Sequence, residues 1–120
     1  MGIANKLNSG RKQTVREGID TKDIPYMNIK DFAGTNPDYP VSLAGFFIKT
    51  GEYGEQVTLI VMDDEQPTGL NIPKRYVEDF KDLDPDEIDD IINGKLAISG
   101  ITVDVKTPKG KTCMIDFIDL

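Results

Sequence analysis

The spacing of hydrophobic and polar residues changes several times along the chain. Residues 1–23 are polar, and their apolar side chains are too sparse to form one buried face, which predicts a flexible arm. From residue 24 onward, apolar residues recur at every third position up to Phe32 and the pattern stops at Gly34, which predicts a short helix. We therefore expect an arm over residues 1–23 and one folded domain over residues 24–120.

Strand patterns follow from residue 41. Residues 41–50 and 56–62 are rich in apolar and β-branched side chains, and two glycines separate them, which is typical of a β-hairpin. A shorter apolar segment, residues 69–72, predicts a third strand. Three strands in succession therefore open the folded domain.

Side chains of the predicted hairpin alternate so that both of its faces are apolar. Leu43, Phe47 and Leu59 belong to one face, whereas Phe46 and Ile60 belong to the other. Only one face can line a small barrel. We expect the second face to be covered by the arm, by helices, by another copy of the chain or by nucleic-acid bases, because large exposed apolar patches are unusual on monomers.

Helical spacing returns after the third strand and then gives way to strands. Residues 73–83 start with a proline and place apolar side chains on one face, and residues 84–93 start with a capping sequence and end before a glycine. Residues 95–105 and 112–118 predict a second hairpin, in which the alternation slips at Gly100. A β-bulge at this glycine would account for the slip.

This order of elements predicts a mainly β protein. Three strands, a helical connection and two further strands match a five-stranded Greek-key barrel of the OB type, with helices between the third and fourth strands and an N-terminal arm. A five-stranded open sheet with one packed helix, or an SH3-like barrel with an insertion, would have the same order.

Composition limits the chemistry that the chain can perform. The 120 residues include no histidine and a single cysteine, Cys113, which excludes Ser-His-Asp triads, Cys-His dyads and Cys/His zinc pairs. Residues 82–86 resemble the start of a calcium loop, but Glu87 stands where such a loop requires glycine, so we expect no metal site. We expect a protein that is not an enzyme and needs no cofactor.

Charge is distributed unevenly along the chain. The net charge is −7, yet residues 1–30 carry six basic and three acidic side chains, whereas residues 63–92 carry three basic and eleven acidic ones. A local basic groove is compatible with this balance. Because no segment has the 18 or so uncharged apolar residues of a membrane span and no signal sequence is evident, we expect a cytoplasmic protein without membrane contact.

Lysines and aromatic residues gather at the turns of the two predicted hairpins. Lys49 and Tyr53 lie at the first turn, and Lys106, Lys109 and Lys111 lie at the second. Single-strand binders combine a cationic track for phosphates with flat side chains on which bases stack. We expect DNA binding at these turns, although a lysine-rich turn can equally be a solvated surface.

Two further elements complete the predicted DNA-binding surface. Phe46 would offer a ring on the second apolar face, and the basic arm would contribute Arg11, Lys12 and Arg16. Arms of this composition often contact phosphate, but they are equally often solvated tails.

Residues 46–57, with the sequence FFIKTGEYGEQV, and residues 71–76, with the sequence NIPKRY, resemble single-stranded-DNA-binding proteins from phages of lactic-acid bacteria. The resemblance covers about residues 24–120. It implies an OB-fold, sequence-independent binding of single-stranded DNA without catalysis, homo-oligomerisation, and a role in phage DNA replication or recombination.

One feature departs from many bacterial single-strand binders, which recruit partner enzymes through a free acidic tail. Residues 115–120 of this chain have the pattern of a last strand instead. If replication or recombination proteins are partners, we expect them to bind the acidic helices around residues 78–90. The alternative to DNA binding is an OB-like protein-interaction module.

Overall fold

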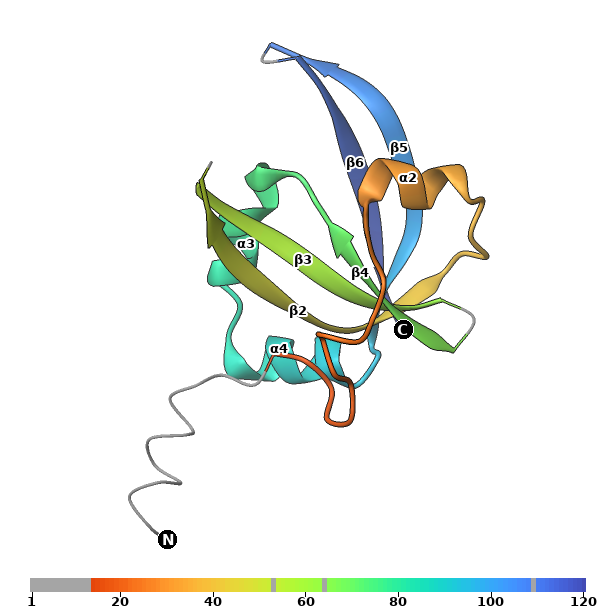
Figure 1. Cartoon of the computed structure of the whole chain (residues 1–120), viewed down its shortest axis with the longest axis vertical. Helices are drawn as coiled ribbons and strands as arrows, with labels where there is room; N and C mark the ends of the chain where they lie inside the picture. The colour runs from red at the N-terminus through yellow and green to blue at the C-terminus, as the bar shows by residue number, and fades with distance from the viewer. Residues whose placement is uncertain (1–13, 53, 64, 109) are drawn as a thin grey trace, which may run out of the picture.

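The computed structural model describes residues 14–52, 54–63, 65–108 and 110–120, and these form one strongly curled mixed sheet with a few short helices (Figure 1). The strands occur in the spatial order β1-β4-β3-β2-β5-β6. Their bounds are Tyr26–Asn28 (β1), Val41–Gly51 (β2), Gly54–Asp63 (β3), Gln66–Asn71 (β4), Leu96–Thr107 (β5) and Gly110–Asp119 (β6). The prediction of a mainly β protein is confirmed.

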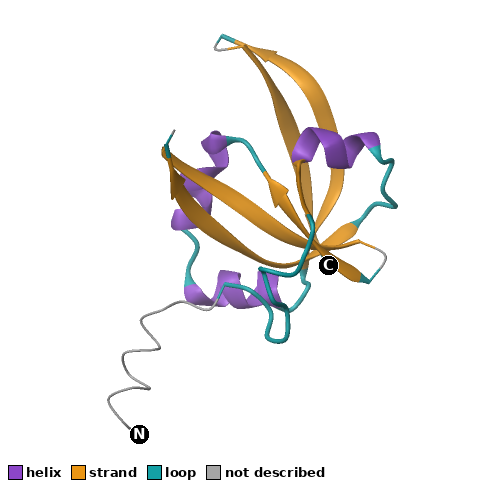
Figure 2. Ribbon diagram, in the orientation of Figure 1, coloured by secondary structure: helices purple, strands orange, loops and turns teal. Residues whose placement is uncertain are grey.

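The helices lie in two places, before β2 and between β4 and β5 (Figure 2). They are α2 (Ile29–Gly34), the 3₁₀ turn η1 (Lys74–Tyr76), α3 (Val77–Lys81) and α4 (Pro85–Ile92). At the start of α4, Asp84 and Glu87 form a reciprocal capping box, with distances of 2.8 and 3.0 Å between the paired nitrogen and oxygen atoms. The predicted helical connection is therefore present.

The order β5-β2-β3-β4 within the sheet is that of a Greek key, because β5 returns through the helical connection to lie beside β2. The expected number of five strands is wrong. Tyr26 and its two successors, which the sequence places near a helix, instead pair in parallel with Gly69–Asn71 of β4. The helix begins only after Asn28, because the Asn28 side chain accepts a hydrogen bond from the Asp31 amide at 2.8 Å.

The sheet forms a half barrel with an open seam, and side chains of η1 bind β6 at this seam. Arg75 Nη2 donates to the carbonyl of Cys113 at 2.8 Å. The Ile115 amide donates to the hydroxyl of Tyr76 at 3.0 Å. These two hydrogen bonds, which we call the seam latch, hold backbone groups of β6 that a neighbouring strand would otherwise bind.

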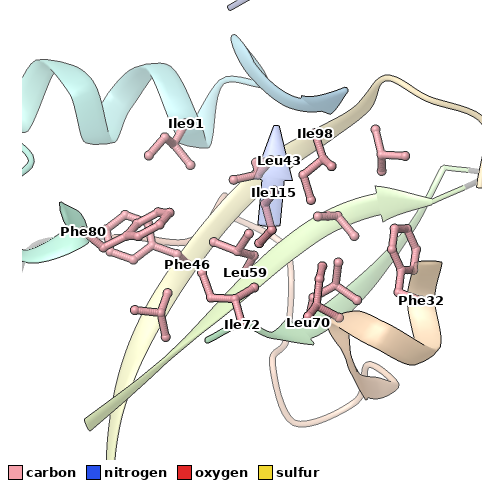
Figure 3. Packing of buried hydrophobic residues seen from close by; sticks show 14 of the residues in the cluster. Phe32, Leu43, Phe46, Leu59, Leu70, Ile72, Phe80, Ile91, Ile98 and Ile115 are labelled. Carbon is pink, nitrogen blue, oxygen red and sulfur yellow. The ribbon is translucent and has the colours of Figure 1, made fainter. Parts of the chain in front are cut away.

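The concave side of the sheet holds the core, which Figure 3 shows as a cluster of aliphatic and phenylalanine side chains between the sheet and the helices. Phe46 belongs to this cluster: it is 3% exposed and its ring centroid lies 4.9 Å from that of Phe80 on α3. The expectation that Phe46 faces outward with Ile60 is therefore wrong.

A β-bulge in β2 explains this reversal. Leu43 is paired with Val61, but the next pair is Gly45 with Ile60, so one extra residue enters β2 and shifts the phase of every later side chain. Phe46 turns inward and Phe47 turns outward as a result. The bulge expected at Gly100 in β5 is confirmed by the register shift between Ile98 and Gly100.

The second apolar face is covered, at this bulge, by the end of the N-terminal segment. The Arg16 amide donates to Ala44 O at 2.7 Å, and the Phe46 amide donates to Thr14 O at 2.8 Å. Ile60 is fully buried although it lies outside the main core cluster. Residues 14–16 therefore pack on β2, in contrast to the flexible arm that their composition predicts.

Candidate nucleic-acid interface

A partly exposed aromatic cluster lies on the outer side of the sheet, where β1, β4, β3 and β2 run side by side. The rings of Tyr26 and Phe47 meet edge to face, with their centroids 6.3 Å apart. The ammonium group of Lys49 lies 5.2 Å from the centroid of Tyr26 and 5.3 Å from that of Phe47. We call these three residues the outer cluster. It combines two ring surfaces with one positive charge.

Local geometry explains why these side chains meet. Phe47 and Lys49 are two residues apart in β2 and so share a face. Tyr26 reaches them because Gly69, its partner in β4, has no side chain: a Cβ at this position would lie 2.3 Å from the tyrosine ring. The Tyr26 hydroxyl donates a hydrogen bond to the carbonyl of Thr21. Tyr26 remains 39% exposed, and Lys49 is exposed as well.

The second group of cations is at the end of the β5–β6 hairpin. Lys106 and Lys111 are directly opposite each other in the ladder and both are exposed. The Thr107 hydroxyl, which donates to Gly110 O at 2.7 Å, fixes the turn between them. Like charges at directly opposed positions destabilise a strand pair. An anion bound between these two lysines would remove this repulsion.

A third basic element lies next to the second. Lys74, Arg75 and Lys111 line a cavity of about 390 Å³ between η1 and the β5–β6 hairpin. The ammonium group of Lys74 also lies near the β2–β3 turn, 3.9 Å from the position that a Cβ on Gly54 would take. In Figure 1 the segment leading from β4 into η1 runs between the two hairpins. Basic side chains of η1 are thus placed close to both turns.

The sequence-predicted site residues divide into four groups. Lys49, Lys106 and Lys111 are exposed on the hairpins. Phe46 is a core residue and its ring is unavailable for stacking. Arg16 is half-buried, and its Nε donates to the carbonyl of Ile92 at 2.8 Å, so it ties the N-terminal segment to the end of α4. The remaining predicted residues lie outside the described residues: Tyr53, Lys109, Arg11 and Lys12.

Tyr26 and Phe47 were missed as a pair, since the sequence predicts a short helix around Tyr26 and assigns Phe47 to the face of the hairpin opposite Phe46. The signal that could have found Phe47 is Gly45, a glycine inside an apolar strand, which often marks a bulge. The pairing of β1 with β4 had no comparable signal because β1 has only three residues.

The densest group of acidic side chains lies in and around α3 and α4. Residues 78–90 hold eight of the 21 acidic residues of the chain. One acidic residue near the β2–β3 turn, Glu55, is paired with Lys81 of α3, and this hydrogen bond raises the pKa of the Lys81 ammonium above its ordinary value of 10.5. Because Glu55 is paired with Lys81, its negative charge is less available to the basic residues near the β2–β3 turn.

Over the ranges 14–52, 54–63, 65–108 and 110–120, no group of three or more acidic or cysteine side chains is placed to hold a metal ion. Within these same ranges, none of the helices has the length and hydrophobicity that a transmembrane helix needs.

No protein-family model, curated protein or solved structure matches this chain. The function therefore has to be inferred from the residues and geometry of the chain itself. The outer cluster and the lysines of the hairpins are the features that point most clearly to one class of ligand, because together they offer ring surfaces and positive charge.

Proposed function

We propose that the chain is a non-catalytic, sequence-independent single-stranded-DNA-binding protein with an OB-like fold, acting in phage DNA replication or recombination. In this proposal β2 to β6 correspond to the five strands of an OB-fold, whose usual ligand surface is the middle strands and the two hairpin loops. The strand β1 is an addition to the edge of the sheet. The phage setting rests on the sequence resemblance of residues 46–57 and 71–76.

The observation that carries the proposal is the outer cluster. Tyr26 and Phe47 form an aromatic surface on the convex side of the sheet, and Lys49 lies over both rings. Stacking of a base on an aromatic ring contributes about 1–3 kcal/mol, and every base has a face suited to it. A phosphate next to a stacked base would meet the Lys49 ammonium. Single strands offer unpaired bases for this contact, whereas duplexes do not.

The hairpin lysines supply the second half of the mechanism. Phosphates that pass the end of β5 and β6 would neutralise Lys106 and Lys111, and the neighbouring cavity offers Lys74 and Arg75. Each neutralised phosphate releases condensed counterions, so the logarithm of the affinity should fall with the logarithm of the salt concentration by about 0.7 per contact. The acidic helices α3 and α4 would repel DNA and so favour the opposite side of the molecule.

Fluorescence anisotropy of a labelled single strand of about 30–40 nucleotides, with matched duplex as competitor, tests this proposal. Phe47→Ala removes a stacking ring, and Lys106→Glu/Lys111→Glu reverses the charge of the hairpin. Lys95→Glu is the control for a change of charge, because Lys95 is exposed next to Asp90 of α4, on the acidic side of the molecule.

We expect tight, salt-sensitive binding to the single strand by the wild type and the control. We expect the Phe47 variant to bind several-fold more weakly at every salt concentration, and the double lysine variant to lose most of its affinity. Preference for the duplex, or binding that salt does not weaken, would overturn the proposal. A complete lack of binding at low salt would favour the protein-interaction module instead.

A further inference from the structure

A small apolar pocket opens on the other side of the molecule, between α3, α4 and the last strands. It has a volume of about 270 Å³ and its walls are almost entirely hydrocarbon. Aromatic rings form much of the wall, because Phe117 meets Tyr76 at a centroid distance of 6.2 Å and Phe80 at 6.5 Å. The lining side chains are Tyr76, Phe80, Leu83, Ile91, Leu96 and Phe117.

Carboxylates border this pocket. Asp79 lies on its rim, and an adjoining cavity of about 220 Å³, which shares Leu83 with it, is bordered by Glu87, Asp90 and Asp119. Residues 78–90 contain eight acidic side chains and a single lysine. That lysine, Lys81, is paired with Glu55 of β3. Lys95 also lines the adjoining cavity and lies 3.7 Å from Asp90, so the two cavities together are lined by four carboxylates and one ammonium group.

The volume and the charge of the pocket restrict what it can hold. A cavity of this size is smaller than the 300–1,000 Å³ or so of pockets for drug-sized ligands, but it accepts a single leucine, isoleucine or phenylalanine side chain. The carboxylates of the rim attract lysine and arginine and repel nucleic acid. Docking the same face of a second copy would place carboxylates against carboxylates, because a two-fold interface repeats the same surface on both sides.

We propose that this pocket and its rim bind a basic peptide segment of a partner protein, with one apolar side chain of the peptide in the pocket and its lysines or arginines against Asp79 and Asp90. The inference is independent of the proposed DNA binding, since the outer cluster contributes nothing to the pocket. It assigns the acidic helices a binding role in addition to repelling DNA.

A labelled synthetic peptide, with phenylalanine and leucine at its centre and three lysine or arginine residues on either side, is the probe. A second peptide with serine in place of both apolar residues tests whether binding requires an apolar side chain in the pocket. The rim variant is Asp79→Lys/Asp90→Lys. The matched control is Glu17→Lys/Asp38→Lys, which makes the same change of charge at exposed positions away from the pocket. Circular dichroism and urea denaturation establish that both variants fold.

We expect the rim variant to bind the apolar peptide about tenfold or more weakly than the wild type, and the control variant to bind it nearly as well as the wild type. We expect the serine peptide to bind weakly to all three proteins. Amide NMR shifts on adding the peptide to the wild type should centre on Leu83, Ile91 and Phe117.

Three results would overturn the inference. Equal affinity of the rim and control variants for the peptide would show attraction to overall charge alone. Equal binding of the two peptides would show that the pocket takes no anchor. Light scattering that finds a wild-type dimer which the rim variant cannot form would assign the face to a second copy. None of these results bears on DNA binding, which is measured with oligonucleotides on the same variants and should be retained.

Discussion

Two surfaces of this molecule present aromatic side chains, and they differ in the charge beside them. On the outer cluster a lysine lies over Tyr26 and Phe47. At the pocket beside α3, Asp79 and its acidic neighbours border Tyr76 and Phe117. Exposed rings alone would suit many ligands. In our two proposals, this difference in charge favours anionic ligands with flat groups at the first surface and cationic ligands with an apolar anchor at the second.

Strand β2 contributes side chains to the first surface and packs behind the second. Phe46 points inward and packs on Phe80, one of the walls of the pocket, whereas Phe47 points outward into the outer cluster. The bulge at Gly45 decides which ring goes to which side. Substitutions of Phe46 and Gly45 should therefore act mainly on stability, whereas substitution of Phe47 should act mainly on ligand binding.

The largest effect is expected for Phe46→Ala. Removing a buried phenylalanine side chain costs about 3–5 kcal/mol of unfolding free energy, which urea denaturation measures. Phe47→Ala is the control, because Phe47 is only half-buried and its loss should cost much less. If Phe47→Ala were the more destabilising change, the assigned phase of β2 would be wrong.

A smaller loss of stability is expected for Gly45→Val. A Cβ at Gly45 would lie 2.4 Å from Thr14 O and 2.5 Å from Val15 Cα, and the backbone φ of +153° disfavours a branched side chain. We expect a loss of about 1–3 kcal/mol in urea denaturation and a displacement of residues 14–16. Gly34→Ala, where the added methyl group meets no atom within 4 Å, should leave the urea midpoint nearly unchanged. Similar midpoints for the two variants would contradict the packing of the N-terminal segment.

The next effect concerns the lysine of the outer cluster and is seen in DNA affinity rather than stability. Lys49→Ala should lower the magnitude of the salt slope by about 0.7, which corresponds to one phosphate contact, while Phe47→Ala should weaken binding without changing the slope. Anisotropy titrations at several salt concentrations measure both. Lys49→Arg keeps the charge and should keep the slope. A slope that is the same in all four proteins would remove Lys49 from the DNA contact.

The smallest effect is expected from the titration of Lys81 and Tyr39. The hydrogen bond with Glu55 raises the pKa of Lys81, and burial raises the pKa of the Tyr39 hydroxyl above 10.0. In both cases the folded state holds its proton to a higher pH than the unfolded state, so stability is complete below about pH 10 and falls as the pH rises further. Urea midpoints between pH 7 and pH 11 should show this decline, reduced in Lys81→Met. A decline that begins near neutral pH would point to other groups.

The sequence predicted those parts of the fold that depend on local pattern. The hairpins, the capped start of α4, the helical connection and the bulge at Gly100 all follow from spacing and turn residues over short stretches. The Gly45 bulge was missed because Ala44 and Gly45 lie in an otherwise continuous apolar run, so the change of phase leaves no polar residue out of place. A shift of one residue was enough to exchange Phe46 and Phe47.

The outer cluster depends on contacts between residues that lie far apart in the sequence, which local sequence patterns do not predict. Tyr26 reaches Phe47 only because a three-residue strand pairs with β4 and because Gly69 leaves room for its ring. Exposure of the lysines could be anticipated, since charged turn residues rarely become buried. The position of the lysines relative to η1 could not be predicted, because it depends on the direction in which the β5–β6 hairpin extends from the rest of the sheet.

The seam latch has a consequence for the behaviour of the protein at high concentration. A half barrel leaves strand edges, and β6 is ten residues long and carries exposed Met114 and Ile118. Unprotected edges of this kind pair with the edges of other molecules and initiate aggregation. Arg75 and Tyr76 occupy the carbonyl of Cys113 and the amide of Ile115 in the middle of that edge. The latch therefore interrupts the edge as a template for intermolecular sheets, and so contributes to the solubility of a barrel that does not close.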